Sequence, residues 1–194
     1  GGSAVNWQII KGERETAVSV FWVDPGIDTG PIIVQKSAPI GPEDSAGSLY
    51  YNALFTLGVE AVLDAVQLIA ADKAPRLPQD ESLATYDPLC GDEHAGIDWA
   101  QPVVQVHNLI RGCDPQPGAR TSWQGETLRL YNAQCVSDGE CTPGVVADIS
   151  DAGLIIGAVG GGVRIARVRY GAEKKGSAAD FARTHGVTVG SQLG

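Results

Sequence analysis

The sequence predicts an α/β unit followed by a small β-barrel unit, and three observations lead to this fold class. Two β-rich runs, at residues 16–23 and 30–36, flank a short loop that contains two glycines. Apolar residues then recur at helical spacing from about residue 54 to residue 70. Beyond a proline-containing acidic stretch, short β-like runs alternate with glycine and acidic turns, which is typical of a small barrel.

The elements of the first unit read as the last portion of an α/β domain. Residues 4–11 look like the end of a helix that Gly12 stops. The two strands follow, and a longer helix begins near Asp44 or Ser45 and ends before Pro75. The pairing of the strands stays open at this stage, because parallel neighbours need a crossover connection that the sequence does not show.

Residues 76–96 hold proline and acids with little periodicity, so they are predicted to be a linker between a first domain, 1–75, and a second, 97–194. The second domain opens with a short helix that has Asp98 near its N-cap and Gly112 just past its end. It closes with a helix over residues 177–185. The β-like runs between these helices lie at residues 127–131, 144–149, 154–156 and 163–170.

The loop between the two strands of the first unit carries the best functional clue. It reads Asp24-Pro25-Gly26-Ile27-Asp28-Thr29-Gly30. The glycines let the backbone turn and approach a ligand, and the proline fixes one torsion. Such a loop presents backbone groups beside a carboxylate, so Asp28 is the predicted catalytic residue. Pro, Gly and Asp also build ordinary hairpin turns, which is the competing interpretation.

The amino-acid sequence around this loop and downstream of it resembles the folate-dependent formyltransferase family. The matches run in order along most of the chain, which makes them more specific than one motif. They are Phe21-Trp22-Val23, Asp28-Thr29-Gly30, Ile33-Val34-Gln35-Lys36, Leu49-Tyr50-Tyr51-Asn52, Lys73-Ala74-Pro75-Arg76-Leu77-Pro78-Gln79, Ala84-Thr85-Tyr86, Ile97-Asp98-Trp99, His107-Asn108-Leu109-Ile110-Arg111-Gly112 and Pro117-Gly118-Ala119. Within the family the chain resembles most the hydrolase domain of 10-formyltetrahydrofolate dehydrogenase, with methionyl-tRNA formyltransferase and amino-sugar formyltransferases as relatives.

This resemblance implies a fold and a truncation. The first domain is expected to be the C-terminal part of a Rossmann-like catalytic domain, and the second an oligonucleotide-binding (OB)-like β-barrel. In the family, an Asn-x-His sequence and a Ser-Leu-Leu-Pro-like stretch precede the segment that matches residues 1–7, and neither is present here. The chain also contains no Met. It is therefore expected to be an N-terminally truncated fragment, inactive by itself.

The resemblance also implies the chemistry. The substrate is expected to be 10-formyltetrahydrofolate, whose formyl group passes to water or to an amine through a tetrahedral oxyanion. The missing histidine and asparagine are expected to stabilise that charge, while Asp28 orients the nucleophile or manages its proton. The folate is expected to lie against the loop residues Val23, Asp24, Gly26, Ile27, Asp28, Thr29 and Gly30.

Charge bears on the formyl acceptor. The net charge is −9, and residues 1–95 carry five Lys or Arg against fourteen Asp or Glu, whereas residues 96–194 carry nine of each sign. Because proteins that grip a phosphate backbone use Lys and Arg, tRNA is possible but disfavoured as a partner. A local cluster of Arg164, Arg167, Arg169, Lys174 and Lys175 reads as a solvated strand face, with a phosphate contact as the alternative.

Other side chains receive weaker interpretations. The four cysteines show no C-x-x-C spacing and no histidine group beside them, so no metal site is expected; Cys135 and Cys141 are possible disulfide partners. His107 reads as a packed structural histidine, and Arg111 as a bridge between domains or a substrate contact. The glycine run at residues 157–162 lacks a P-loop lysine and reads as a hairpin connection.

The sequence thus predicts a cytoplasmic enzyme fragment of one-carbon metabolism, with the hydrolase-like branch favoured and methionyl-tRNA formyltransferase as the alternative. No membrane partner is expected, because no uninterrupted apolar run approaches the roughly 18 residues of a spanning helix. An alternative of another class is a non-catalytic OB-like module that binds RNA or a protein partner. Salt-dependent RNA binding distinguishes that module from the enzyme.

Overall fold

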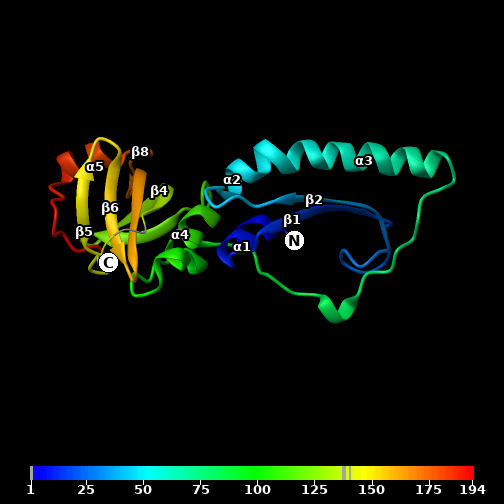
Figure 1. Ribbon diagram of the computed structural model, residues 1–194, viewed down its shortest axis with the longest axis horizontal. Coiled ribbons are helices and arrows are strands. Elements are labelled where there is room, and N and C mark those ends of the chain that lie inside the picture. The colour runs from blue at the N-terminus through cyan, green and yellow to red at the C-terminus, as the bar shows by residue number, and fades with distance from the viewer. Residues whose placement is uncertain (1, 137–138, 140) are drawn as a thin grey trace.

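A computed structural model of the protein describes residues 2–136, 139 and 141–194. The molecule is elongated, with an N-terminal unit on the right of Figure 1 and a sheet-containing C-terminal unit on the left. The α/β class expected from the sequence is confirmed, because the described chain combines helices with antiparallel sheets.

The N-terminal unit is a two-stranded ribbon covered by a long helix. Helix α1 (Ala4–Ile10) precedes strands β1 (Glu15–Phe21) and β2 (Ile32–Pro39), which pair antiparallel with Glu15 opposite Pro39. Helix α2 (Ala46–Leu49), a π-helical turn η1 (Tyr50–Leu54) and helix α3 (Phe55–Ala70) then follow without a break. Figure 1 shows α3 lying along the ribbon. The antiparallel register settles the strand pairing that the sequence left open.

The start of the long helix has a clear local cause. Ser45 accepts a hydrogen bond from the Ser48 amide at 3.1 Å, while the Ser48 hydroxyl accepts one from the Ser45 amide at 2.9 Å. This reciprocal pair satisfies two of the backbone donors that a helix N-terminus leaves free. The predicted start near Asp44 or Ser45 is therefore confirmed.

The helical stretch Ala46–Ala70 is long and apolar enough to cross a membrane by length and composition, with a mean hydropathy of 1.7 and 17% of the window buried. The sequence contains no uninterrupted apolar run here, because Gly, Thr and two acids divide the stretch. Those acids, Glu60 and Asp64, lie 3.6 and 2.7 Å from the Lys36 ammonium on β2. Packing of α3 on the ribbon accounts for only part of this apolar surface, because much of it is exposed.

The C-terminal unit is built on one antiparallel sheet. Its strands are β3 (Ala119–Trp123), β4 (Glu126–Val136), β5 (Val146–Ser150), β6 (Gly153–Ala158), β7 (Gly161–Tyr170) and β8 (Gly176–Ser177). Their order is β3-β4-β7-β6-β5, with β8 on β7. Helices α4 (Val103–Gly112) and α5 (Ala178–His185) pack against this sheet. Because hydrogen bonds among the described residues trace an open path, the OB-like barrel stays a prediction.

The two units have cores of unequal size. The larger core fills the C-terminal unit between the sheet and helices α4 and α5 and includes fully buried Ile110, Leu128, Leu154, Ile156 and Ile165. The smaller one lies under α2 and holds Ile9, Ala38, Ile40, Ala46, Leu49 and Leu54. Most of α3 lies beyond this small core, which leaves much of its apolar surface exposed.

Two sequence expectations about the C-terminal unit were wrong in detail. Strand β3 was missed, because Ala119-Arg120-Thr121-Ser122-Trp123 has only one β-branched residue and no apolar alternation. Asp98 does not cap α4: its carboxylate accepts from the Ala100 amide and the Gln101 side chain in a preceding turn. The helix begins at Val103 because Pro102 has no amide hydrogen and fits only at its start.

The remaining element predictions for this unit are confirmed. The glycine run at residues 157–162 is the β6–β7 hairpin connection, with Ala158 paired to Gly161. Helix α5 starts after Ser177, whose hydroxyl accepts from the Asp180 amide at 3.3 Å, and ends at Gly186 with φ 69°. Cys135 and Cys141 are free thiols, so their possible disulfide is absent.

The cap of α5 yields a stability prediction. Ser177→Ala removes the hydroxyl that accepts from Asp180, and we expect it to lower the free energy of unfolding by about 1 kcal/mol. Urea unfolding followed by circular dichroism measures this difference. Ser177→Asp keeps an acceptor at the cap and is expected to stay near the wild type; equal losses for both variants would contradict the capping role.

Candidate active site

The loop that carries Asp28 spans residues 22–31 between β1 and β2. Its ends are joined by a hydrogen bond from the Trp22 amide to the Pro31 carbonyl at 2.9 Å. Gly30 lies inside this closure, and a Cβ there would stand 1.6 Å from the Trp22 carbonyl oxygen. Position 30 therefore has to be glycine for the two ends of the loop to meet.

Asp24 holds the loop in shape. Its Oδ1 atom accepts hydrogen bonds from the Gly26 amide at 3.0 Å and from the Thr29 hydroxyl at 2.8 Å. A carboxylate that bonds to a backbone amide two residues ahead forms a local turn of the kind Asp favours. Both hydrogen bonds that this oxygen accepts come from the loop, so Asp24 stabilises the loop structure.

Asp28 is placed differently. Its backbone has φ 57°, in the left-handed region that non-glycine residues seldom adopt and that Asp tolerates. The side chain is exposed, and its carboxylate accepts no hydrogen bond from another described residue. Two apolar side chains that precede it in the loop, Val23 and Ile27, are 92% and 91% exposed. A free carboxylate and unpacked apolar side chains in one loop suit a ligand with both an aromatic and a polar part.

The interdomain linker also reaches this loop. Ile32 and Leu77 exchange backbone hydrogen bonds of 2.7 and 3.1 Å, and the Gln79 side-chain amide donates to the Asp28 and Gly30 carbonyls. In the sequence, Gln79 stands out only as part of a family match. Nothing local marks it as a loop contact, because its partners lie 51 and 49 residues earlier.

An apolar groove of about 670 Å³ opens beside β1. Val5 and Gln8 of α1 form one wall, and Phe55, Val59 and Val62 of α3 form the other. The three α3 side chains are exposed. Along this groove β1 is paired only on its β2 side among the described residues, so its other edge offers free backbone groups.

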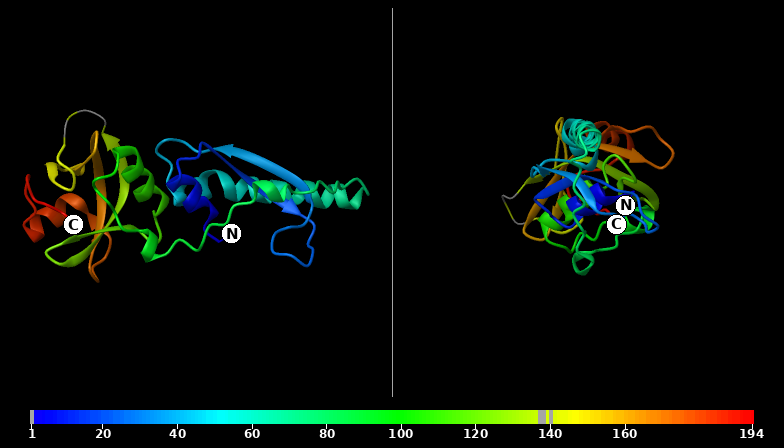
Figure 2. Two further views of the ribbon diagram at one scale, coloured as in Figure 1. Left: turned by 90° about the horizontal axis from the view of Figure 1, so that it is seen from below. Right: turned by 90° about the vertical axis from the view of Figure 1, so that its right-hand side faces the viewer.

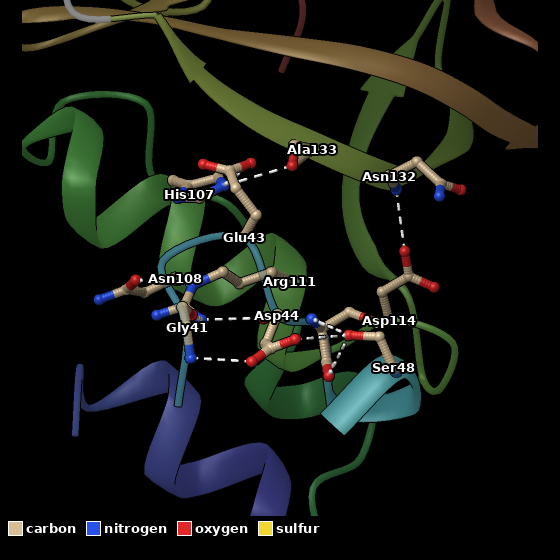
Figure 3. A network of polar contacts seen from close by, with 11 residues as sticks. Gly41, Glu43, Asp44, Ser48, His107, Asn108, Arg111, Asp114, Asn132 and Ala133 are labelled. Atoms are coloured by element: carbon tan, nitrogen blue, oxygen red, sulfur yellow. Dashed lines mark hydrogen bonds and ion pairs between the residues drawn. The ribbon is translucent and has the colours of Figure 1, made fainter. Parts of the chain in front are cut away.

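A second polar cluster lies at the junction of the two units (Figure 3), at the other end of the N-terminal unit from the loop (Figure 1). The Arg111 Nη1 atom on α4 donates to the Gly41 carbonyl at 3.2 Å and to the Asp44 carbonyl at 2.8 Å. Its Nε atom donates to Asn108 Oδ1 at 3.0 Å. Of the two interpretations offered by the sequence, the structure thus supports the bridge between domains.

His107 belongs to the same cluster and is buried. Its Nε2 atom lies 3.3 Å from the Ala133 carbonyl oxygen and 4.0 Å from the Glu43 carboxylate. Burial lowers the pKa of His107, although the Ala133 carbonyl and Glu43 act in the opposite direction. The structural interpretation of this histidine agrees with its packed position.

Metal ligands and disulfides do not contribute to the site as described. Within residues 2–136, 139 and 141–194, no group of three His, Cys, Asp or Glu side chains is arranged to hold a metal ion. Cys90 and Cys113 are buried free thiols, and burial raises the pKa of both. They are inert core residues rather than nucleophiles.

Comparisons with known proteins identify the family. A model described as "Formyl transferase" matches residues 1–66, and one described as "Formyl transferase, C-terminal domain" matches residues 91–186. The chain belongs to the formyltransferase family. The folate-dependent family expected from the sequence is therefore confirmed, and both units take part in the match.

Individual relatives show the same relationship. Methionyl-tRNA formyltransferase of Syntrophus aciditrophicus is 37% identical over 195 residues, which cover 100% of this chain and 62% of that protein. Mitochondrial 10-formyltetrahydrofolate dehydrogenase of Homo sapiens is 43% identical over 152 residues, covering 78% of this chain and 16% of that protein. The chain thus spans less than two thirds of these formyltransferase relatives.

A solved structure extends the comparison to three dimensions. HypX from Aquifex aeolicus, in complex with tetrahydrofolic acid, superposes with a TM-score of 0.78 at 26% identity, covering 96% of this chain and 33% of that one. The superposition includes both units of the formyltransferase-family chain.

The junction gives a prediction about pH. Because burial lowers the pKa of His107 in the folded state, the unfolded chain binds the proton more readily. Stability from neutral His107 is present above its ordinary pKa of about 6.5 and is lost as pH falls toward the lowered folded value. We therefore expect the free energy of unfolding to fall between about pH 7.5 and about pH 5.5.

The matched variant is His107→Gln, which keeps a donor for Ala133 and does not titrate. Urea unfolding of both proteins across this pH interval should show a smaller loss for the variant. Equal pH dependence of the two proteins would remove His107 as the cause.

Proposed function

We propose that the full-length protein acts on 10-formyltetrahydrofolate, removing its formyl group with Asp28 as a catalytic residue. The observation that carries this proposal is the exposed, unpartnered Asp28 carboxylate on a glycine-flanked loop, in a chain of the formyltransferase family. Support for the folate comes from a similar solved structure, HypX, which is in complex with tetrahydrofolic acid.

The loop residues Val23, Asp24, Gly26, Ile27, Asp28, Thr29 and Gly30 form the proposed folate contact. Exposed Val23 and Ile27 offer apolar surface to the flat pterin ring. Gly26 and Gly30 instead let the loop fold on itself, because a Cβ there would stand 2.0 Å from the Thr29 hydroxyl oxygen and 1.6 Å from the Trp22 carbonyl oxygen. Asp28 then lies where its carboxylate orients the attacking group or takes its proton. Formyl transfer creates an oxyanion, which needs a donor that Asp28 does not provide.

We further propose that this donor is supplied by a part of the full-length protein other than the residues of this chain. The free edge of β1 and the apolar groove against α3 support this, because they are what remains when neighbouring strands of an α/β domain are taken away. The proposed division is a Rossmann-like part at residues 1–75, a linker at 76–96 and an OB-like domain at 97–194.

Two candidate activities, a hydrolase and a tRNA-dependent transferase, differ in the acceptor of the formyl group. Water as acceptor is favoured by the acidic first half and by the similarity to 10-formyltetrahydrofolate dehydrogenase. Methionyl-tRNA as acceptor is favoured by the match of the whole chain to a methionyl-tRNA formyltransferase. We retain the hydrolase-like branch as the first candidate and the tRNA-dependent transferase as the second.

One structural feature also favours the second candidate. A groove of about 680 Å³ between the units is lined by Arg129, Arg169, Lys174 and Lys175. Arg129 is engaged with Asp92 through bonds of 2.8 and 2.7 Å, but the buried Arg169 Nε atom has no hydrogen-bond partner among the described residues. Arginine and lysine side chains of this kind can bind phosphate groups through charge-assisted hydrogen bonds. Formyl release from 10-formyltetrahydrofolate without tRNA selects the hydrolase, and strict dependence on methionyl-tRNA selects the transferase.

The role of Asp28 is tested in the full-length protein with Asp28→Asn. Asparagine keeps the shape and tolerates the left-handed backbone but lacks the charge and basicity of the carboxylate. We expect kcat to fall by at least about 100-fold, the scale of a lost general acid or base.

Asp72→Asn is the matched control. Asp72 is also exposed with a left-handed φ of 55°, but it follows α3 and lies outside the proposed site. It should retain wild-type turnover. Unchanged turnover in Asp28→Asn, with folate turnover intact in the wild type, would refute the role of Asp28.

A further inference from the structure

The first residues after α3 run back along the N-terminal unit and pass beside the Asp28 loop, as Figures 1 and 2 show for the linker in green and the loop in blue. Three contacts fix this part of the linker. Leu77 pairs with Ile32, the Trp22 indole donates to the Pro75 carbonyl at 2.9 Å, and the Arg76 guanidinium lies 4.4 Å from the centre of the Trp22 ring.

Gln79 comes directly after this fixed segment. Its Nε2 atom donates to the Asp28 carbonyl oxygen and to the Gly30 carbonyl oxygen, both at 2.8 Å. A side-chain amide has two N–H donors, so one Gln79 can satisfy both carbonyls at once. The two acceptors lie on either side of Thr29, and together they define the orientation of the peptide units around Asp28.

The chain after Gln79 forms a local turn. Asp80 Oδ1 accepts from the Ser82 amide at 3.0 Å and from the Ser82 hydroxyl at 2.6 Å, which starts the short helix η2 (Glu81–Leu83). These bonds lower the pKa of Asp80, with the hydroxyl contact as the larger cause. Gln79 therefore projects from a backbone segment that is anchored to the N-terminal unit before it and shaped by a local turn after it.

The loop itself needs such support. Its apolar side chains Val23 and Ile27 are almost fully exposed, so packing does not hold them, and Asp28 has a backbone conformation that costs energy. Asp24 ties Gly26 to Thr29 but does not reach the Asp28 peptide unit. Among the described residues, the Gln79 bonds are what fixes the backbone of Asp28.

We propose that Gln79 is a positioning residue for Asp28: the interdomain linker holds the catalytic turn from outside through one side-chain amide. The inference rests on the proposed function, because it assigns Gln79 a part in the same reaction. It adds that residues 75–79, expected from the sequence to lie at the end of a domain and the start of a linker, belong functionally to the site.

The test uses Gln79→Glu, which has almost the same shape but cannot donate a hydrogen bond when ionised. The control is Gln67→Glu, which makes the same charge change on an exposed α3 side chain that has no hydrogen bond to a described residue. Both variants are made in the 194-residue chain and in the full-length protein.

In the 194-residue chain, backbone order parameters from ¹⁵N relaxation report directly on the loop. We expect the amides of Asp28 and Thr29 to fall from values near about 0.85 to below about 0.6 in Gln79→Glu, and to be unchanged in Gln67→Glu. Unchanged order in both variants would overturn the proposal, whether or not the protein is an enzyme.

In the full-length protein, kcat at saturating 10-formyltetrahydrofolate should fall between about tenfold and about 100-fold in Gln79→Glu, because a displaced carboxylate loses its alignment with the substrate. The melting temperature should equal that of Gln67→Glu. If the melting temperature of Gln79→Glu fell together with kcat, Gln79 would be only a structural contact. If KM alone changed, Gln79 would be only a binding contact. A wild type without folate turnover would overturn the proposed function, while the order parameters would still decide whether Gln79 holds the loop.

Discussion

The position of Arg111 at the junction is the constraint on which the arrangement of the two units depends. This side chain leaves α4 in the C-terminal unit and donates to the Gly41 and Asp44 carbonyls, which lie between β2 and the start of α2. Burial lowers the pKa of the guanidinium, while Asp44 and Glu43 oppose this. A buried cation is tolerable only with its donors satisfied, and the planar fork of arginine reaches several acceptors that a lysine ammonium cannot match in geometry.

The turn between β2 and α2 links the two units. It closes the N-terminus of the long helix and also contacts the C-terminal unit. The Asp44 carboxylate accepts from the Gly41 amide and from the Ser48 hydroxyl, so the turn is closed before α2 begins. The Gly47 amide then donates to the Asp114 carbonyl, and Asp114 Oδ2 accepts from the Asn132 amide of β4. Figure 3 shows the Asp44 contacts with Gly41 and Ser48 and the Asp114 contact with Asn132. The helix that flanks the proposed site is thereby fixed to the C-terminal sheet, although the Asp28 loop lies at the other end of the unit (Figure 1).

Local patterns predicted much of this structure. The strands flanking the loop, the start of the helix at Ser45 and the cap and stop of α5 at Ser177 and Gly186 all depend on neighbours within a few residues. The loop contact of Gln79 was missed because it spans 51 residues, and no periodicity carries such information. For Arg111, whose bond spans 70 residues, the sequence left a bridge between domains and a substrate contact as alternatives. Strand β3 was missed because pairing to β4, rather than its own composition, makes it a strand.

The most direct measurement of the central claim is a structure of the full-length protein with tetrahydrofolate bound. The account predicts the pterin ring against residues 23–30, with the Asp28 carboxylate facing the nitrogen that carries the formyl group and the Gln79 amide still bonded to the Asp28 and Gly30 carbonyls. Folate bound elsewhere, with this loop free of ligand, would contradict the assignment of the site.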